Sequence, residues 1–143
     1  MSVEWVIDAS VVAAVLFKEI GSDSARSFLD RELTAGSTLG APDLMPLEVA
    51  SIAAKKVWRA DVDPEDGRAA VQTALDLIKD NTISASTLAL RAHELAAAHH
   101  FSAYDACYLA LAENRTIRVA TLDAKLARRA DETGLGHLVH LLT

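Results

Sequence analysis

The segment WVIDAS at residues 5–10, with the apolar run behind it, decides the fold. Residues 5–7 are apolar and predict a short buried strand that ends at Asp8. The run from Val11 to Lys18 predicts a helix, and Asp8 or Ser10 can cap its first turn. A strand that passes directly into a helix is typical of α/β proteins, so we expect Asp8 at the carboxyl edge of a parallel sheet.

The rest of the chain repeats this alternation. Further helices are predicted over residues 23–33, 44–59, 69–79, 87–99, 103–113 and 124–131, and further strands over 37–41, 82–83, 118–120 and 137–142. No repeat, linker or low-complexity segment divides the 143 residues. We therefore expect one Rossmann-like domain over residues 1–143. It has three α/β/α layers and a mostly parallel central sheet of about four to five strands.

The sequence predicts the start and the packed faces of two helices in more detail. Asp43 follows Pro42 and is the expected N-cap of the helix over residues 44–59, and residues 61–67 are expected to form a polar turn after it. Glu48 lies off the apolar face of that helix, on a stripe with basic residues. The packed faces expected from helical spacing are Leu47, Ala50, Ala54, Val57 and Trp58 on the first helix, and Tyr104, Cys107, Tyr108 and Leu111 on the helix over residues 103–113.

Composition limits the possible partners. The formal net charge is −6, so a protein that grips nucleic acid through overall positive charge is disfavoured, and any such contact must be local. Two basic clusters are open to two interpretations, a solvated helix surface or a path for RNA. They are Lys55, Lys56 and Arg59, and Lys125, Arg128 and Arg129.

The chain carries no sign of export or membrane insertion. Its single cysteine, Cys107, cannot form an internal disulfide, which fits a reducing cytoplasmic setting. The start lacks a basic signal-peptide region, and the apolar run at residues 11–17 is too short to span a bilayer. We also find no persuasive metal-ligand spacing among the five histidines, which we interpret as structural or surface residues.

Four acidic residues stand where strands end or helices begin: Asp8, Glu48, Asp105 and Asp123. Each has a structural alternative as a helix cap or a solvated residue. Taken together they predict one shared pocket, because the strand ends of an open parallel sheet form a crevice. Two unit charges ~5 Å apart repel by roughly 3 kcal/mol at an effective dielectric near 20. Bound Mg²⁺, or Mn²⁺ in its place, would offset that repulsion.

Four short motifs along the chain match the pattern of one known family. Asp8-Ala9-Ser10, Pro42-Asp43 with Glu48, the run SAYDA at residues 102–106, and Thr121-Leu122-Asp123 together resemble the PIN-domain ribonucleases, and most closely the VapC-type toxins of toxin–antitoxin pairs. The resemblance covers nearly the whole chain. It implies a PIN-like α/β/α domain, Mg²⁺ or Mn²⁺ dependence, cleavage of RNA, a homodimer and a cognate antitoxin protein.

The resemblance also assigns roles to residues. Asp8 and Asp105 would be the principal metal ligands, with Asp123 and Glu48 completing the catalytic site directly or through water. Thr121 and Ser10 would orient a carboxylate or a water molecule.

Other functions compete with this one. A phosphoacceptor receiver domain also places acids at strand ends, but it needs a second acid near Asp8 and a late lysine. A haloacid-dehalogenase-like phosphatase needs a second Asp after Asp8. A non-catalytic PIN-like interaction module would keep the fold without the chemistry.

Overall fold

The computed structural model describes residues 3–143. In this part of the chain five parallel strands form one sheet in the order β3-β2-β1-β4-β5. The strands are β1 (Trp5–Ile7), β2 (Leu39–Pro42), β3 (Thr82–Ile83), β4 (Arg118–Thr121) and β5 (Val139–Leu141). The helices are α1 (Ala9–Phe17), α2 (Ser22–Thr34), α3 (Met45–Trp58), α4 (Pro64–Leu77), α5 (Ala85–His99), α6 (Ala103–Arg115) and α7 (Ala124–Glu132), with a short 3₁₀ turn at Gly136–Leu138.

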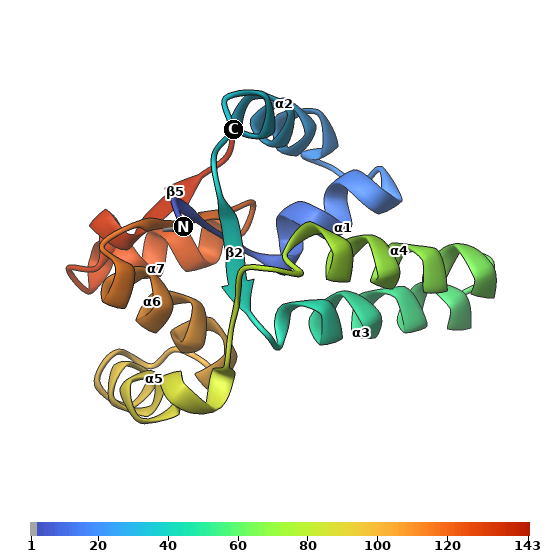
Figure 1. Cartoon of the computed structure of the whole chain (residues 1–143). Helices are drawn as coiled ribbons and strands as arrows, with labels where there is room; N and C mark the ends of the chain where they lie inside the picture. Colours follow the sequence, from blue (N-terminus) through green and yellow to red (C-terminus); the bar gives the residue numbers. More distant parts are fainter. Residues whose placement is uncertain (1–2) are drawn as a thin grey trace.

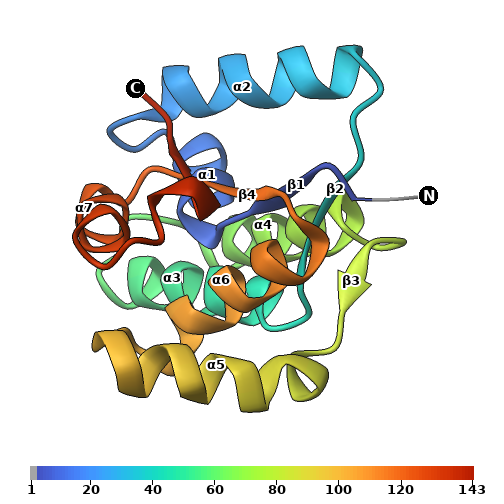
Figure 2. The same ribbon diagram turned by 90° about the vertical axis from the view of Figure 1, so that its left-hand side faces the viewer.

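Helices cover both faces of the sheet, as the sequence predicts. On one face α6 packs against β1, β2 and β4, and α5 packs against α6 from outside. Figure 1 shows α5, α6 and α7 on one side of β2, with α1, α3 and α4 on the other. Figure 2 shows the central strands between α2 and α5. The expected three-layer α/β/α arrangement is confirmed.

The core lies between the sheet and its helices. Val6, Ile7 and Val119 on the two central strands have no exposed surface, and α6 buries an unbroken run from Ala106 to Ala112. Full burial of one such large aliphatic side chain stabilises the fold by about 1.5–3 kcal/mol. The central strands and α6 are therefore a well-packed support for the residues at the carboxyl edge of the sheet.

The register of the central strands brings two distant segments together. Ile7 on β1 pairs with Ala120 on β4, and the backbone N–H of Asp8 donates to the carbonyl of Ala120 at 3.2 Å. Asp8 and Thr121, the next residue on each strand, therefore meet at the carboxyl edge of the sheet.

The structure corrects the expectations for α3. This helix begins at Met45, and Asp43 does not cap it; Asp43 Oδ1 accepts from the backbone N–H of Ala85 instead, at the start of α5. The expected apolar face is also wrong. Leu47 and Trp58 are 73% and 77% exposed, while the buried side of the helix is Met45, Pro46, Val49 and Ala53.

The segment after α3 is more helical than expected. The polar turn expected over residues 61–67 is wrong in its second half, because α4 begins at Pro64, with Asp63 as its N-cap residue. Proline suits the first helical position, where its missing N–H loses no intrahelical bond. α3 and α4 pack together as an antiparallel hairpin (Figure 1). Over residues 3–143, none of the helices has the length and apolar character needed to cross a bilayer.

Candidate active site

The fold brings the four predicted acidic residues into one electrostatic group, which we call the acidic site: Asp8, Glu48, Asp105 and Asp123. Asp8 follows β1, Asp123 follows β4 at the start of α7, and Glu48 and Asp105 lie in the first turns of α3 and α6. The charge of Asp8 acts on both Glu48 and Asp105, and the charge of Asp123 acts on Asp8 and Asp105. Four separate segments therefore contribute carboxylates to one region at the carboxyl edge of the sheet.

Two hydroxyl groups hold Asp8. Ser10 Oγ and Thr121 Oγ1 both donate to Asp8 Oδ2, at 2.8 and 2.7 Å. The hydroxyls are themselves fixed, because the backbone N–H of Leu122 donates to Ser10 Oγ and that of Asp123 donates to Thr121 Oγ1. Thr121 is completely buried. The expectation that Ser10 and Thr121 orient a carboxylate is confirmed. The other oxygen, Asp8 Oδ1, accepts no hydrogen bond from a side chain among residues 3–143.

A buried tyrosine holds Glu48. The Tyr108 hydroxyl donates to Glu48 Oε1 at 2.6 Å, and the tyrosine is only 1% exposed. Helical spacing predicts that Tyr108 packs in the core, but it does not predict the contact with Glu48. Its position three residues after Asp105 was the available signal, because residues three apart on a helix lie on the same side.

The remaining two acids lie at helix starts. Asp123 Oδ1 accepts from the backbone N–H groups of Lys125 and Leu126, so Asp123 is a true N-cap of α7. Ser102 caps α6 by accepting from the backbone N–H of Asp105 at 3.1 Å. These caps are worth about 1 kcal/mol each and fix the first turns that carry Asp105 and Asp123.

The acidic site is electrostatically strained. Burial raises the pKa of Asp8, and Asp123 raises it further, while the hydroxyls of Thr121 and Ser10 oppose the shift. Burial, then the charges of Asp8 and Asp105, raise the pKa of Glu48 against its hydrogen bond from Tyr108. The pKa of Asp105 is raised by burial and by Asp8 and Asp123. Removing carboxylates from water and crowding them together disfavours their ionised forms.

These shifts predict the pH dependence of stability in EDTA. Asp8, Glu48 and Asp105 hold protons more tightly in the folded state, so their contribution to the free energy of unfolding is complete below about pH 4. It falls as pH rises through the raised pKa values. We expect thermal melts of Asp8→Asn to lose less stability than wild type between acidic and neutral pH. Parallel pH profiles for the two proteins would contradict the coupling.

The donor set fits a hard divalent cation. All four groups are carboxylates, and oxygen donors are what Mg²⁺ and Mn²⁺ prefer. Among residues 3–143, no three acidic, histidine or cysteine side chains already form a group that could hold a metal ion. That result is compatible with Mg²⁺, which usually keeps several waters and binds through one or two carboxylates plus substrate phosphate. The excess negative charge, rather than a preformed cage, is what favours the cation.

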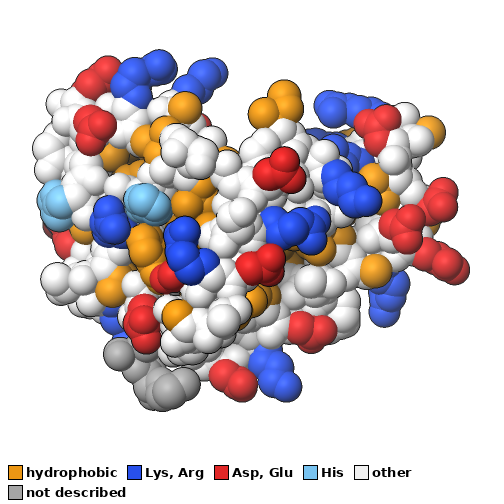
Figure 3. Space-filling model, turned by 90° about the horizontal axis from the view of Figure 1, so that it is seen from above, with side chains coloured by type: hydrophobic (Ala, Val, Ile, Leu, Met, Phe, Trp, Pro, Cys, Tyr) orange, Lys and Arg blue, Asp and Glu red, His pale blue; other side chains and the backbone are white. Residues whose placement is uncertain are grey.

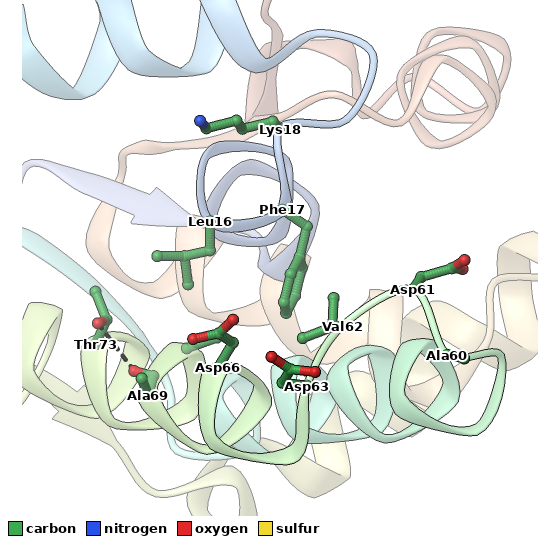
Figure 4. A pocket seen from close by; sticks show the side chains of 11 residues that line it. Leu16, Phe17, Lys18, Ala60, Asp61, Val62, Asp63, Asp66, Ala69 and Thr73 are labelled. Atoms are coloured by element: carbon green, nitrogen blue, oxygen red, sulfur yellow. Dashed lines mark hydrogen bonds between the residues drawn. The ribbon is translucent and has the colours of Figure 1, made fainter.

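A cleft at the end of α1 is separate from the acidic site. It has a volume of about 490 Å³ and lies between the end of α1 and α4, with Leu16 and Phe17 facing Asp63 and Asp66 (Figure 4). None of the four acids of the acidic site lines it. Cys107, which lies on α6 beside the acidic site, is buried, and burial raises the pKa of its thiol. A raised pKa disfavours the reactive thiolate form of Cys107.

The parallel sheet, its two helical layers and the carboxylates at its carboxyl edge together define a nuclease-like α/β protein of the PIN type. The chain matches the PIN domain family over residues 5–132 and belongs to that family. It is 30% identical over 125 residues to Ribonuclease VapC3 of Pyrobaculum aerophilum, an alignment that covers 87% of this chain and 92% of that protein. The resemblance to VapC-type proteins is thereby confirmed.

A solved structure supports the same architecture. The crystal structure of PAE2754 from Pyrobaculum aerophilum superimposes with a TM-score of 0.67 at 19% identity, covering 90% of this chain and 87% of that chain. At this identity the likeness concerns the fold alone. Because the chain belongs to the PIN family, the receiver-domain and phosphatase alternatives are wrong.

Proposed function

We propose that this protein is a divalent-metal-dependent endoribonuclease, the toxin of a toxin–antitoxin pair, with the whole chain acting as one PIN-like domain. The observation that carries the proposal is the acidic site, where carboxylates from four segments meet and where burial and neighbouring charges raise the pKa values of Asp8, Glu48 and Asp105. Membership of the PIN family and similarity to a protein named as a ribonuclease support the same activity.

The residues of the site have distinct tasks in this proposal. Asp8 and Asp105 would be the main ligands of Mg²⁺ or Mn²⁺, with Glu48 and Asp123 acting directly or through water. Such an ion, when bound, lowers the pKa of water and offsets charge on the phosphate. Ser10 and Thr121 keep Asp8 in one orientation, and Tyr108 does the same for Glu48. Fixed ligands of this kind reduce the reorganisation that substrate binding requires.

RNA must be bound locally, because the chain is acidic overall. Figure 3 shows Lys and Arg scattered among Asp and Glu on the face seen from the side of α2, without one continuous basic surface. Lys125 and Arg128 are exposed on α7 just after Asp123, and neither has a carboxylate within 4 Å among residues 3–143. In the other predicted cluster Lys56 pairs with Glu19 at 2.7 Å, which leaves Lys55 and Arg59 as the candidates there.

The direct test is cleavage of structured and single-stranded RNAs by purified protein with Mg²⁺, with Mn²⁺ and with EDTA. We expect cuts with either metal and none in EDTA. Intact RNA under all conditions, with the protein folded, would favour the non-catalytic interaction module instead.

A second expected result concerns stability rather than activity. Binding of Mn²⁺ to the folded state alone stabilises it by about 2.7 kcal/mol at a hundred times Kd. For a chain of this size that corresponds to a rise in melting temperature of roughly 5–11 °C. Differential scanning fluorimetry with and without Mn²⁺ measures this, and EDTA should reverse it. An unchanged melting temperature at saturating Mn²⁺ would argue against the acidic site as a metal centre.

We also propose a cytoplasmic homodimer that a cognate antitoxin protein neutralises. Trp58 supports the dimer, because it is 77% exposed beside a shallow groove that is mainly apolar, with a volume of about 280 Å³. The groove includes Ala50, Ala54, Val57 and Val71, from α3 and α4. An exposed apolar patch of this kind is typical of an interface.

The dimer is tested by Trp58→Lys. Loss of a central tryptophan typically costs 2 kcal/mol or more, so we expect roughly thirtyfold weaker self-association by analytical ultracentrifugation. Ile20→Lys, at a fully exposed position outside α3 and α4, is the matched control and should leave the dimer intact. Equal association of both variants would exclude this groove as the interface.

A further inference from the structure

Tyr104 is exposed without a structural reason. Helical spacing predicts that it lies on the packed face of α6, and that prediction is wrong, because Tyr104 is 65% exposed in the first turn of the helix. Among residues 3–143 its side chain makes no hydrogen bond, no contact with another aromatic ring and no cation–π contact. Tyr108, one turn further on, is 1% exposed and holds Glu48. Packing therefore explains only one of the two tyrosines.

Tyr104 lies close to a carboxylate of the acidic site and to the basic side of α7. It directly precedes Asp105, so an exposed aromatic ring lies in the same turn of α6 as one carboxylate of the acidic site. The basic side of α7 lies close to the same helix start, because Arg129 Nε donates to the carbonyl of His99 at 3.4 Å. His99 is the last residue of α5, and the short loop after it leads into α6. Carboxylates, an exposed aromatic ring and unpaired basic groups thus lie next to one another.

We propose that Tyr104 is the stacking platform for an unpaired nucleobase of single-stranded RNA, one nucleotide or so away from the phosphate at the acidic site. This inference rests on the proposed ribonuclease function and names a substrate subsite of it. Bases of single-stranded RNA stack on aromatic side chains because every base has a π-face. Lys125 and Arg128 would contact the flanking phosphates, which position the strand without reading its sequence.

RNA is a better occupant of this surface than a protein. Tyr104 and Asp105 share the first turn of α6, so the base attached to a phosphate bound at Asp105 would come within reach of Tyr104. The basic groups on α7 favour a polyanion, whereas an apolar protein partner would leave Lys125 and Arg128 without counter-charge. A paired base is less available, since its faces are already stacked in the duplex.

The test compares Tyr104→Ala, Tyr104→Phe and Tyr104→Trp. Binding of a short mixed-sequence single-stranded RNA is measured by fluorescence anisotropy in EDTA, and KM and kcat for its cleavage are measured with Mn²⁺. We expect Tyr104→Ala to weaken binding roughly 5- to 150-fold and to raise KM correspondingly, with Phe and Trp restoring both. Leu90→Ala is the control, because Leu90 is 83% exposed on α5. It should behave as wild type.

RNAs with a single abasic nucleotide make the test specific. One abasic position should weaken binding to wild type and have no further effect on Tyr104→Ala, because both changes remove the same stack. Additive losses would overturn the proposal, and so would cleavage and binding by Tyr104→Ala equal to wild type. If the alanine variant instead loses dimerisation while its RNA affinity stays unchanged, Tyr104 is a protein contact and the proposal is wrong.

The stacking subsite and the ribonuclease function are distinguished by different results. Cleavage by wild type that does not depend on Tyr104 overturns only the stacking subsite. Wild-type protein that neither binds nor cuts any RNA overturns the ribonuclease function and the subsite together.

Discussion

Asp8→Asn and Asp105→Asn are each expected to reduce metal-dependent RNA cleavage by at least about a hundredfold. Metal-assisted stabilisation of a phosphoryl transition state is worth several kcal/mol, and each 1.36 kcal/mol is a factor of ten in rate. Asparagine keeps the size of the side chain and one oxygen, but it removes a charge from the centre of the acidic site. Asp8 acts electrostatically on Glu48 and Asp105, so its loss changes the whole group.

The same variants separate a binding defect from an unfolded protein. Asp8→Asn should lose the rise in melting temperature with Mn²⁺, yet the metal-free variant should be at least as stable as wild type near neutral pH. Burial and Asp123 raise the pKa of Asp8, so its ionisation costs stability there. Asp61→Asn removes an equal charge from an exposed position and should change neither property. Cleavage that survives in both Asp8→Asn and Asp105→Asn would rule out the acidic site as the catalytic centre.

The sequence predicted the parts of the fold that depend on local patterns. The apolar segment before Asp8 predicts β1 because three apolar residues are too few for a buried helix, and the structure buries Val6 and Ile7 fully and Trp5 in part. The capping pattern from Ser102 to Asp105 placed the start of α6 correctly, since a serine that accepts from the N–H three residues on is itself the helix-start signal.

Long-range contacts explain the errors. Asp43 has the right chemistry for an N-cap of α3, but the parallel pairing of β2 with β3 brings the start of α5 within its reach. Helical spacing groups Leu47 with Trp58 correctly, but it cannot show which side of an amphipathic helix faces the body of the protein. α4 packs against α3, and the smaller residues Val49 and Ala53 become the buried side.

The candidate site was predicted in outline from acids at strand ends and helix starts. What the sequence could not show is how each carboxylate is held. The pairing of Thr121 with Asp8 depends on the register of β1 with β4, and the contact of Tyr108 with Glu48 joins residues 60 positions apart. Such partners become visible only when the helices are packed on the sheet.

Tyr108→Phe is expected to weaken Mn²⁺ binding and RNA cleavage by about 10- to 100-fold, the usual effect of losing a group that orients a metal ligand. Phenylalanine fills the same buried space but cannot donate to Glu48 Oε1, so the carboxylate is free to rotate away. Isothermal titration with Mn²⁺ and steady-state cleavage measure the two effects. Tyr104→Phe is the matched control, because it removes a hydroxyl from an exposed tyrosine of the same helix that makes no hydrogen bond among residues 3–143.

A double-mutant cycle decides whether Tyr108 acts through Glu48. Glu48→Gln removes the charge while its carbonyl oxygen can still accept from the Tyr108 hydroxyl. If positioning Glu48 is the task of Tyr108, adding Tyr108→Phe to Glu48→Gln should cost little more than Glu48→Gln alone, because the group being oriented no longer serves as an anionic ligand. Fully additive losses would show that Tyr108 supports the site by another route, through the packing of α6 under Asp105. Strongly non-additive losses of Mn²⁺ affinity and cleavage would instead show that the buried Tyr108 hydroxyl acts by orienting Glu48 as a metal ligand.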